Sequence, residues 1–436
     1  MSKPAFSVPR GMKDIESEEM AKRLWIAEKS LDTLRRYGFM LVEPSAIENL
    51  ETLEAKSGPS IRNEIYWFED KAGRKQGLRF DLTIGLARMI ANRQDWPVPA
   101  KFCAMSNMWR YDEPQFGRYR SFYQWDAEIF GTPEVEADAE VVALSLDLME
   151  NLGLNSVEAR INSRKLMEGF LEAQGVIERE RLEAALRIID KIQGVTDGEL
   201  RGNFEKIGLS SSVIDKLLDF ARIRSEPGEN LESLTTLVGE NEKALLGLKD
   251  LNKLMETMKA LGKSGNCILD LGIVRGIAYY DGIVFEVYDK KSENVGAIAG
   301  GGRFDGLCKL YGRDLPATGV AGGIERLLLS LENAKVLPKL SQAPRIFVVA
   351  IDDSVRENVL KIVSDLRRLD VNVDYDLRKR SLSKQLEYVD SLGISMALIV
   401  GPREVKRGVV KIRDMTERKE RELPLDEAYR FISGSV

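Results

Sequence analysis

A helical repeat of apolar residues precedes a series of shorter apolar segments. In residues 16–37, apolar side chains such as Leu24, Leu31 and Leu34 recur at helical spacing between charged positions, which predicts an amphipathic helix. Gly38 follows the last turn of this repeat and is a plausible helix stop. The pattern therefore predicts one long surface helix ahead of the first strand.

Four short runs further along are rich in apolar and aromatic side chains and favour β-strands: residues 40–44, 78–82, 101–109 and 121–130. A helix is expected between two of them, over residues 83–92. Strands with helices before and between them indicate an α+β domain built on an antiparallel sheet.

The residue pattern changes over residues 161–261, where Leu, Ile, Glu and Lys recur at helical spacing. This pattern predicts a helical insertion. Strand-like sequence returns over residues 267–287, and in residues 319–332 a GVAGG turn is expected to open another helix. The insertion is therefore expected to interrupt one domain, whose halves are residues 1–160 and 262–335.

Residues 336–344 contain two prolines and are expected to form a linker. Over residues 345–436, strand-like and helical segments alternate, which is the βαβ pattern of a small α/β domain. Basic clusters such as residues 378–380 would suit a phosphate backbone, although an ordinary solvated surface explains each of them equally well.

Composition limits the broad class of protein. The chain has 436 residues, of which 44% are hydrophobic and 31% charged, as in globular proteins of two to four domains. Its net charge of −5 gives no bulk basicity, but nucleic-acid binding needs only a local basic face. Neither a membrane-length apolar run nor an apolar signal segment is found, so we expect a cytoplasmic protein without membrane contact.

Cysteine and histidine content exclude several kinds of site. Three separated cysteines without a CxxC motif indicate neither a disulfide framework nor a zinc site. The chain contains no histidine, which excludes Ser-His-Asp triads, HExxH metal sites and imidazole general bases. Enzymatic chemistry here would depend on positioning, on fixed charge and on any metal that carboxylates hold.

Two segments combine arginines with glycines, aromatics and acids: residues 109–131 and 274–286. Arginine stays charged and offers a rigid fork of donors, so several arginines on one sheet favour a planar anionic ligand, with phosphate the first candidate. A further arginine follows the GVAGG sequence, where glycines allow a ligand to approach the backbone. The four arginines are Arg110, Arg118, Arg275 and Arg326.

The segment YQWDAE alternates polar and apolar side chains. If it forms a strand, Gln124, Asp126 and Glu128 share one face, and the residues between them share the other. Regularly spaced polar side chains suit either solvent or a polar pocket, and the sequence leaves both open.

Several segments together resemble a known enzyme family. Residues 109–131 resemble motif 2 of class II aminoacyl-tRNA synthetases, residues 319–327 resemble motif 3, and residues 37–44 resemble motif 1. The sequence RGIAYYDGIVFE, residues 275–286, resembles a signature of the histidyl-tRNA synthetase family. Matches to the same family also occur in residues 9–14, 78–83, 381–393 and 397–401. The sequence departs from the common pattern at Phe80, Tyr111, Tyr123 and Ala278.

This resemblance implies a two-step reaction. The carboxylate of histidine attacks the α-phosphate of ATP, giving histidyl-adenylate and pyrophosphate, and the histidyl group then moves to tRNA(His). By motif position, Arg110 is expected to contact the α-phosphate and the substrate carboxylate. Arg118 and Arg326 are expected to hold the outer phosphates with Mg²⁺, whose protein ligands stay unassigned. Arg275 is expected to stabilise the charge that develops on the α-phosphate.

The resemblance also implies an amino-acid pocket and an assembly. Asp81 and Thr83 are expected to bind the α-ammonium group. The imidazole is expected to lie among Glu128, Tyr279 and Tyr280, with Gln124 nearby and Arg110 and Arg275 toward the carboxylate. A class II antiparallel-sheet domain, a C-terminal anticodon-binding domain and a homodimer follow from the same resemblance.

Two other readings fit parts of the sequence. Synthetase-like regulatory subunits of the first enzyme of histidine biosynthesis share the catalytic fold, but they usually lack an anticodon-binding domain. A class II synthetase for another amino acid would share the three motifs, but the RGIAYYDGIVFE segment argues against it.

Overall fold

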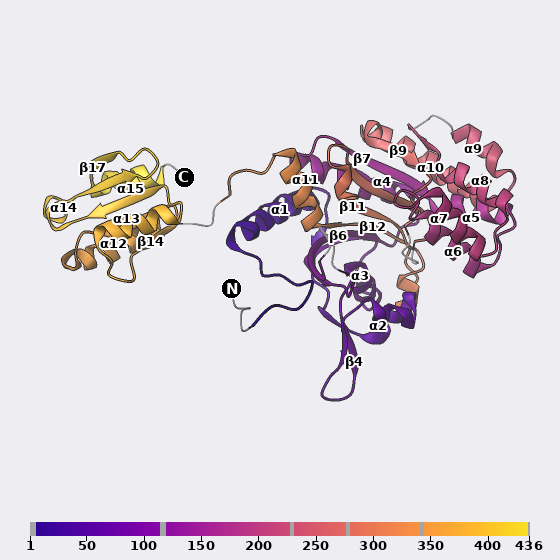
Figure 1. The fold of residues 1–436 in the computed structure, drawn as a ribbon, viewed down its shortest axis with the longest axis horizontal. Coiled ribbons are helices and arrows are strands. Elements are labelled where there is room, and N and C mark those ends of the chain that lie inside the picture. The colour runs from indigo at the N-terminus through magenta and orange to yellow at the C-terminus, as the bar shows by residue number, and fades with distance from the viewer. Residues whose placement is uncertain (1–5, 114–118, 227–230, 276–279, 341–343, 435–436) are drawn as a thin grey trace. The chain divides into compact units, whose positions relative to one another are not determined.

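A computed structural model describes residues 6–113, 119–226, 231–275, 280–340 and 344–434. The chain divides into two compact units, Met1–Lys339 and Leu340–Val436 (Figure 1). No helix in the described part of the chain is long and apolar enough to cross a membrane.

A nine-stranded sheet forms the centre of the first unit, in the order β1-β5-β6-β12-β11-β10-β7-β9-β8. Neighbouring strands are antiparallel except for the pairs β1–β5 and β7–β9. The strands are β1 (Met40–Leu41), β5 (Ala100–Trp109), β6 (Ser121–Phe130), β7 (Val157–Ser163), β8 (Arg224–Ser225), β9 (Cys267–Asp270), β10 (Ile283–Asp289), β11 (Ala299–Arg303) and β12 (Ala317–Gly323).

Alternation along the strands separates two cores. On β6, Trp125 and Ala127 belong to a core that includes Ile26 of α1 (Ser17–Arg36), several residues of α4 (Val135–Asn151) and Leu327 of α11 (Ile324–Ala334). Phe130 faces the other way, into a smaller core with α3 (Leu82–Ala91). The polar residues Gln124, Asp126 and Glu128 lie on this second face of the sheet, as the alternation predicts.

Four predicted elements are confirmed almost residue for residue: α1, α3, β5 and β6. The strand predicted over residues 78–82 is wrong. Strand β4 (Lys75–Leu78) ends where that prediction begins, and the Asp81 carboxylate caps α3 by accepting a hydrogen bond from the Thr83 backbone at 2.7 Å. The strand predicted over residues 40–44 shortens to β1.

The GVAGG sequence was expected to form a turn, and this prediction is wrong. The sequence makes up most of strand β12. Two of its glycines face bulky neighbours, because a Cβ on Gly322 would lie 2.7 Å from Cε2 of Trp125 and one on Gly319 would overlap the Glu128 carboxylate. The strand-like sequence over residues 267–287 contains two separate strands, β9 and β10, and the described residues between them are not in a strand.

The expected helical insertion consists of packed helices that cover one end of the sheet (Figure 1). Phe170 and Phe220 stack at its centre with ring centroids 3.8 Å apart. The helices are α5 (Arg164–Ala173), α6 (Arg179–Ile189), α7 (Asp197–Lys206), α8 (Ser211–Ala221), α9 (Leu231–Val238) and α10 (Glu242–Ala260). A separate small sheet, β2-β4-β3, is formed by β2 (Ile47–Asn49), β4 and β3 (Trp67–Glu69), next to α2 (Leu50–Ser57).

The second unit has a five-stranded sheet in the order β14-β13-β15-β16-β17. Its first three strands are parallel and are connected by helices, which confirms the predicted βαβ pattern. The elements are β13 (Ile346–Ala350), α12 (Arg356–Arg368), β14 (Val373–Tyr375), α13 (Leu382–Ser391), β15 (Met396–Val400), α14 (Pro402–Arg407), β16 (Val409–Asp414), β17 (Glu420–Pro424) and α15 (Leu425–Ser433).

Candidate active site

A cavity of about 370 Å³ opens on the face of the sheet that carries the polar residues of β6. It brings together six of the residues singled out in the sequence, from four separate segments of the chain. They are Asp81, Arg110, Gln124, Arg275, Tyr280 and Arg326.

Beneath this cavity lies a buried polar layer. Asp126 and Glu128 are 0% and 1% exposed, and neither lines the cavity itself. The Thr83 hydroxyl donates to Glu128 Oε1 at 2.6 Å, and the amide nitrogen of Gln124 donates to Asp126 Oδ1 at 2.8 Å. Thr83 and Glu128 therefore meet below the floor of the cavity, while Gln124 lies at its surface.

Glycines leave the space that this layer needs. Gly319 of β12 lies directly opposite Glu128 in the register of β6 and β12, and a Cβ at this position would overlap Glu128 Oε2. A Cβ on Gly300 of β11 would overlap the Arg275 guanidinium. The side chains of Glu128 and Arg275 therefore lie against β12 and β11, at positions where only glycine leaves room for them.

Arg110 follows β5 and is held at two points. Its Nε donates to the Phe80 carbonyl at 2.9 Å, and its guanidinium lies 5.1 Å from the centre of the Phe122 ring. The first contact joins Arg110 to the segment that carries Asp81. An acid and a base that line the same cavity are thus fixed relative to each other.

Arg275 has a backbone φ of 51°, which is uncommon for a residue with a side chain. Its Nη1 pairs with Glu286 of β10 at 3.0 Å, and its guanidinium lies 5.7 Å from the centre of the Tyr280 ring. Such strain often occurs at functional sites. Here it accompanies a guanidinium oriented by a carboxylate and directed over Gly300.

Arg326 lies in the first turn of α11, and its Nη1 donates to the Ala297 carbonyl at 3.1 Å. Its neighbour Glu325 accepts from the Tyr123 backbone at 3.0 Å and pairs with Arg23 at 2.6 Å. These contacts attach the start of α11 to β6 and α1, and they fix where Arg326 meets the cavity.

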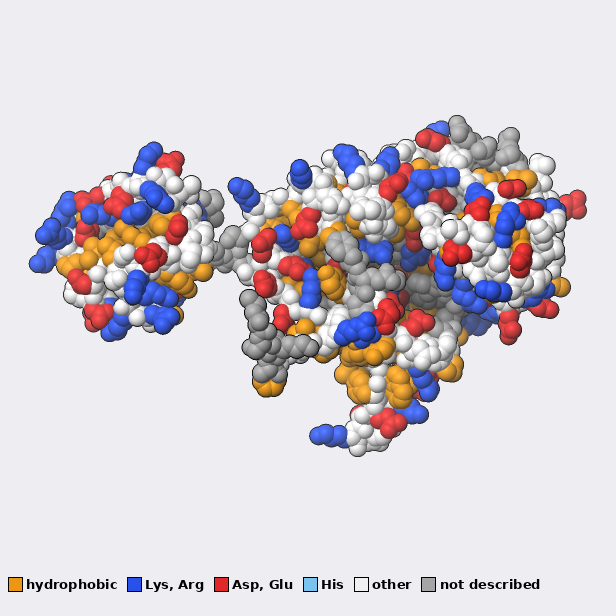
Figure 2. Space-filling view, viewed as in Figure 1, with side chains coloured by type: hydrophobic (Ala, Val, Ile, Leu, Met, Phe, Trp, Pro, Cys, Tyr) orange, Lys and Arg blue, Asp and Glu red, His pale blue; other side chains and the backbone are white. Residues whose placement is uncertain are grey.

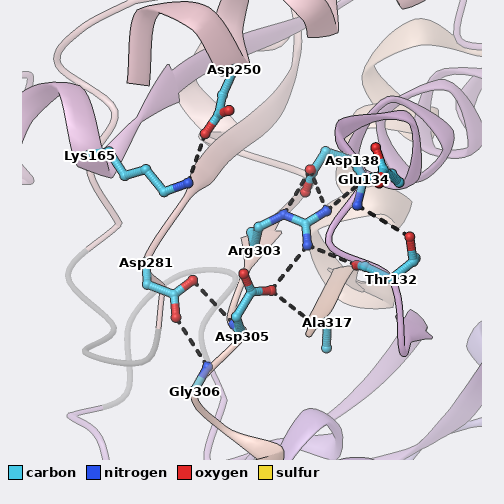
Figure 3. A network of polar contacts seen from close by, with 10 residues as sticks. All are labelled: Thr132, Glu134, Asp138, Lys165, Asp250, Asp281, Arg303, Asp305, Gly306 and Ala317. Atoms are coloured by element: carbon cyan, nitrogen blue, oxygen red, sulfur yellow. Dashed lines mark hydrogen bonds and ion pairs between the residues drawn. The ribbon is translucent and has the colours of Figure 1, made fainter. Parts of the chain in front are cut away.

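A second polar network anchors the segment that precedes β10 (Figure 3). Arg303 donates to Asp138 Oδ2 at 2.6 and 2.9 Å and also to the Thr132 and Glu134 carbonyls. Burial raises the pKa of Asp138 to about 6, even beside this guanidinium. Asp281 accepts from the backbone of the loop that follows Arg303, so this network holds the residue next to Tyr280.

Two of the predicted site residues, Arg118 and Tyr279, lie outside the described residues, as does Ala278. Sequence reasoning placed Asp126 on the correct face but gave it no role, and it overlooked Glu286 and Phe122. Glu286 stands in the same segment as Arg275, but the two are 11 positions apart and Arg275 is not in a strand, so strand periodicity gave no signal for their contact.

Burial raises the pKa of Glu128 well above its ordinary value, and the charge of Asp126 raises it further. The pKa of Asp126 is raised in the same way, first by burial and then by Asp81. A group whose pKa is raised on folding stabilises the fold at low pH, and this contribution is lost as pH rises through the raised pKa. The contribution of Asp126 and Glu128 to the free energy of unfolding therefore decreases as pH increases.

Glu128→Gln tests this cost. Gln keeps the acceptor for Thr83 and cannot ionise, so its stability relative to wild type should rise as pH increases above about 4.3, by at most about 1.4 kcal/mol per pH unit. Urea denaturation at a series of pH values measures the difference. Hydrogen bonds from Arg74 lower the pKa of Asp70, a partly buried residue outside the cavity, so Asp70→Asn should show the opposite trend. A pH-independent difference for Glu128→Gln would contradict the expected buried charge.

No group of three or more Cys, Asp or Glu side chains that could hold a metal ion occurs in the described part of the chain. Mg²⁺ is often bound by one or two carboxylates together with substrate phosphates. Asp112 and Glu325 are among the carboxylates that line the cavity. The cavity therefore fits a Mg²⁺ ion that arrives with a phosphate ligand.

Comparisons with known proteins point to one family. Residues 11–327 match the family model described as histidyl-tRNA synthetase, and residues 345–434 match one described as anticodon binding domain. The histidine--tRNA ligases of Pyrococcus furiosus and Pyrococcus horikoshii are 35% and 37% identical, over 98% and 96% of both chains. The crystal structure of histidyl-tRNA synthetase from Nostoc sp. PCC 7120 superposes with a TM-score of 0.84 and 27% identity, covering 100% of both chains.

Proposed function

Since the chain belongs to the histidyl-tRNA synthetase family, we propose that it activates L-histidine with ATP and then transfers the histidyl group to tRNA(His). The observation that carries this proposal is the convergence of Arg110, Arg275 and Arg326 on one polar cavity, in a chain that matches the family over nearly its full length.

In the first step, the histidine carboxylate attacks the α-phosphate of ATP, and pyrophosphate leaves as the bond to the β-phosphate breaks. Reactions of this kind depend mainly on positioning and on stabilisation of charge. Arg110 contacts the carboxylate and the α-phosphate, and Arg275 faces the charge that develops there. Arg326, together with Arg118, holds the outer phosphates.

Asp81 and Thr83 receive the α-ammonium group of histidine. Gln124 and Tyr280, with Tyr279, surround the imidazole, and Glu128 contacts it from the buried layer beneath the cavity. A neutral imidazole has one donor and one acceptor. Such a pocket rejects apolar amino acids strongly, since its polar groups would be left unpaired.

Mg²⁺ would enter with the phosphates of ATP, held on the protein side by Asp112 and Glu325. It would neutralise part of the phosphate charge. Glu325, Asp112 and Arg326 line the same cavity, which supports this arrangement, because all three would act at the pyrophosphate end of the nucleotide.

In the second step, the terminal ribose of tRNA(His) takes the histidyl group. We assign residues 1–160 and 262–335 to the catalytic domain, 161–261 to the helical insertion, 336–344 to the linker and 345–436 to anticodon binding. Lys and Arg side chains are frequent around the C-terminal unit in Figure 2, which suits contact with phosphates. Charging of tRNA would take place in the cytoplasm.

A homodimer is also proposed. Strand β1 lies at the edge of the large sheet, and its two residues, Met40 and Leu41, are each 55% exposed. An edge strand with exposed apolar side chains favours pairing with another chain. Sedimentation that shows a fully active monomer would contradict this assembly.

ATP–pyrophosphate exchange with each of the twenty amino acids tests the proposed function. Exchange is expected with histidine alone, and subsequent charging is expected with tRNA(His). Exchange with another amino acid would overturn the assignment of the pocket. No exchange with any amino acid would favour a synthetase-like regulatory subunit.

A further inference from the structure

Arg79 is a buried arginine, 4% exposed, that joins three segments of the first unit. Its Nη1 donates to the Pro44 carbonyl at 2.7 Å, and its Nε donates to the Asn107 carbonyl at 3.0 Å. Its Nη2 donates to Glu43 Oε1 at 3.2 Å and also to Ser106 Oγ. The guanidinium therefore connects its own segment to the chain that follows β1 and to β5.

The backbone of Arg79 leads directly into the proposed amino-acid site. Its carbonyl accepts from the Trp109 backbone at 3.1 Å, next to Arg110. Two residues after Arg79, Asp81 lines the cavity, and the carbonyl of the residue between them accepts from Arg110 Nε at 2.9 Å. The positions of Asp81 and Arg110 therefore depend on where Arg79 is held.

Arg79 also acts on helix α3 through Pro44. Pro44, whose carbonyl Arg79 binds, packs so closely on α3 that a Cβ on Gly85 would lie 2.7 Å from the Pro44 Cβ. Asp81 caps the same helix through the Thr83 backbone. The contacts of Arg79 therefore fix both the segment before Asp81 and the helix after it.

Burial of the Arg79 charge is costly, because a buried charge is expensive unless it is paired. Its carboxylate partner Glu43 has a side chain that is 67% exposed, whereas the oxygens of Pro44, Asn107 and Ser106 are neutral. An apolar side chain of similar size would fill the space without this cost, but only a rigid fork of donors reaches acceptors on two segments at once. Arg79 is therefore better suited to fixing geometry than to adding stability.

We propose that Arg79 is a positioning residue that holds Asp81 where the α-ammonium group of histidine binds. This inference rests on the proposed histidine pocket and adds a residue to it. Arg79 is not among the described residues that line the cavity, so it acts through the backbone that carries Asp81.

Arg79→Lys provides the direct test, because lysine keeps the charge but has a single nitrogen that cannot span the acceptors of Arg79. The measured quantity is the dissociation constant of 3-(imidazol-4-yl)propanoate divided by that of histidine, from calorimetric titration without ATP. The propanoate lacks only the α-ammonium group, so effects on the imidazole and carboxylate ends cancel in the ratio. We expect the ratio to fall by about ten-fold, since a hydrogen bond between charged groups is worth about that factor or more.

Arg160→Lys is the matched control, because Arg160 is also 4% exposed and pairs with Glu158 and Glu293 at 2.8 and 3.2 Å, away from the cavity. Its ratio should equal that of wild type, even where its thermal midpoint falls. In an Asp81→Asn background, Arg79→Lys should no longer change the ratio, since Arg79 acts through that carboxylate.

Ser106→Ala gives a second test that does not depend on the folding of Arg79→Lys. It removes one acceptor of the Arg79 guanidinium and only one side-chain oxygen, so the ratio should fall in the same direction, by about two- to three-fold. An unchanged ratio in whichever of the two variants folds would overturn the role of Arg79, while histidine-dependent exchange upholds the proposed function. Absence of histidine binding and of histidine-dependent exchange in wild type would overturn both.

Discussion

Replacing Arg275 by alanine is expected to lower the rate of histidine-dependent ATP–pyrophosphate exchange by about 10²–10³. The guanidinium is oriented before substrate arrives, through its pair with Glu286 at 3.0 Å and its position over Gly300. A preorganised charge of this kind stabilises the transition state without reorganisation. The loss should therefore fall mainly on kcat, with little change in KM for histidine.

Two variants separate this effect from general damage. Arg275→Lys keeps the charge but loses the rigid fork, so it should recover only part of the rate. Arg160 makes contacts of the same two kinds outside the cavity, pairing with Glu158 at 2.8 Å and lying 4.0 Å from the Tyr288 ring. Arg160→Ala should lower the thermal midpoint while the folded protein keeps its kcat. A comparable loss of kcat in both alanine variants would contradict the proposed role of Arg275.

Local pattern was sufficient where an element has one polar and one apolar face. Helix α1 is of this kind and followed from its periodicity, whereas strands β5 and β6 followed from runs rich in apolar and aromatic side chains. The pattern was misleading where tertiary contacts decide the backbone. The GVAGG sequence has a turn-like composition, yet it forms a central strand. Its glycines are needed there because Trp125 and Glu128 of the neighbouring strand fill the space that side chains would take.

The same division holds for the site. The motif arginines could be predicted from the sequence because each occurs in a distinctive local context. The contact of Thr83 with Glu128 could not, since it joins residues 45 positions apart across α3 and β6. The pairing of Arg275 with Glu286 likewise could not be predicted, since Arg275 lies outside the strands, between β9 and β10, and the two residues are 11 positions apart.

The second large effect is expected from Gly319→Ala, a substitution that adds one methyl group. That methyl would overlap Glu128 Oε2 and lie 2.8 Å from the Ala127 carbonyl. Overpacking of this kind costs about 1–3 kcal/mol, and displacement of Glu128 from Thr83 would cost about 1–3 kcal/mol more. Together, these costs of about 2–6 kcal/mol are a substantial fraction of the total stability of a domain, about 5–15 kcal/mol.

Gly323→Ala is the matched control for stability, because Gly323 ends the same strand, has a φ of −82°, and a Cβ there meets nothing within 4 Å. Thermal unfolding should show a clear loss for Gly319→Ala and a much smaller one for Gly323→Ala, whose only expected cost is a poorer N-cap for α11. Where the Gly319→Ala protein folds, its KM for histidine should rise, because the displaced carboxylate is the proposed imidazole ligand. Equal stability of the two variants would mean that β6 and β12 can separate without strain, and Glu128 would then not be held in place by the absence of a side chain opposite it.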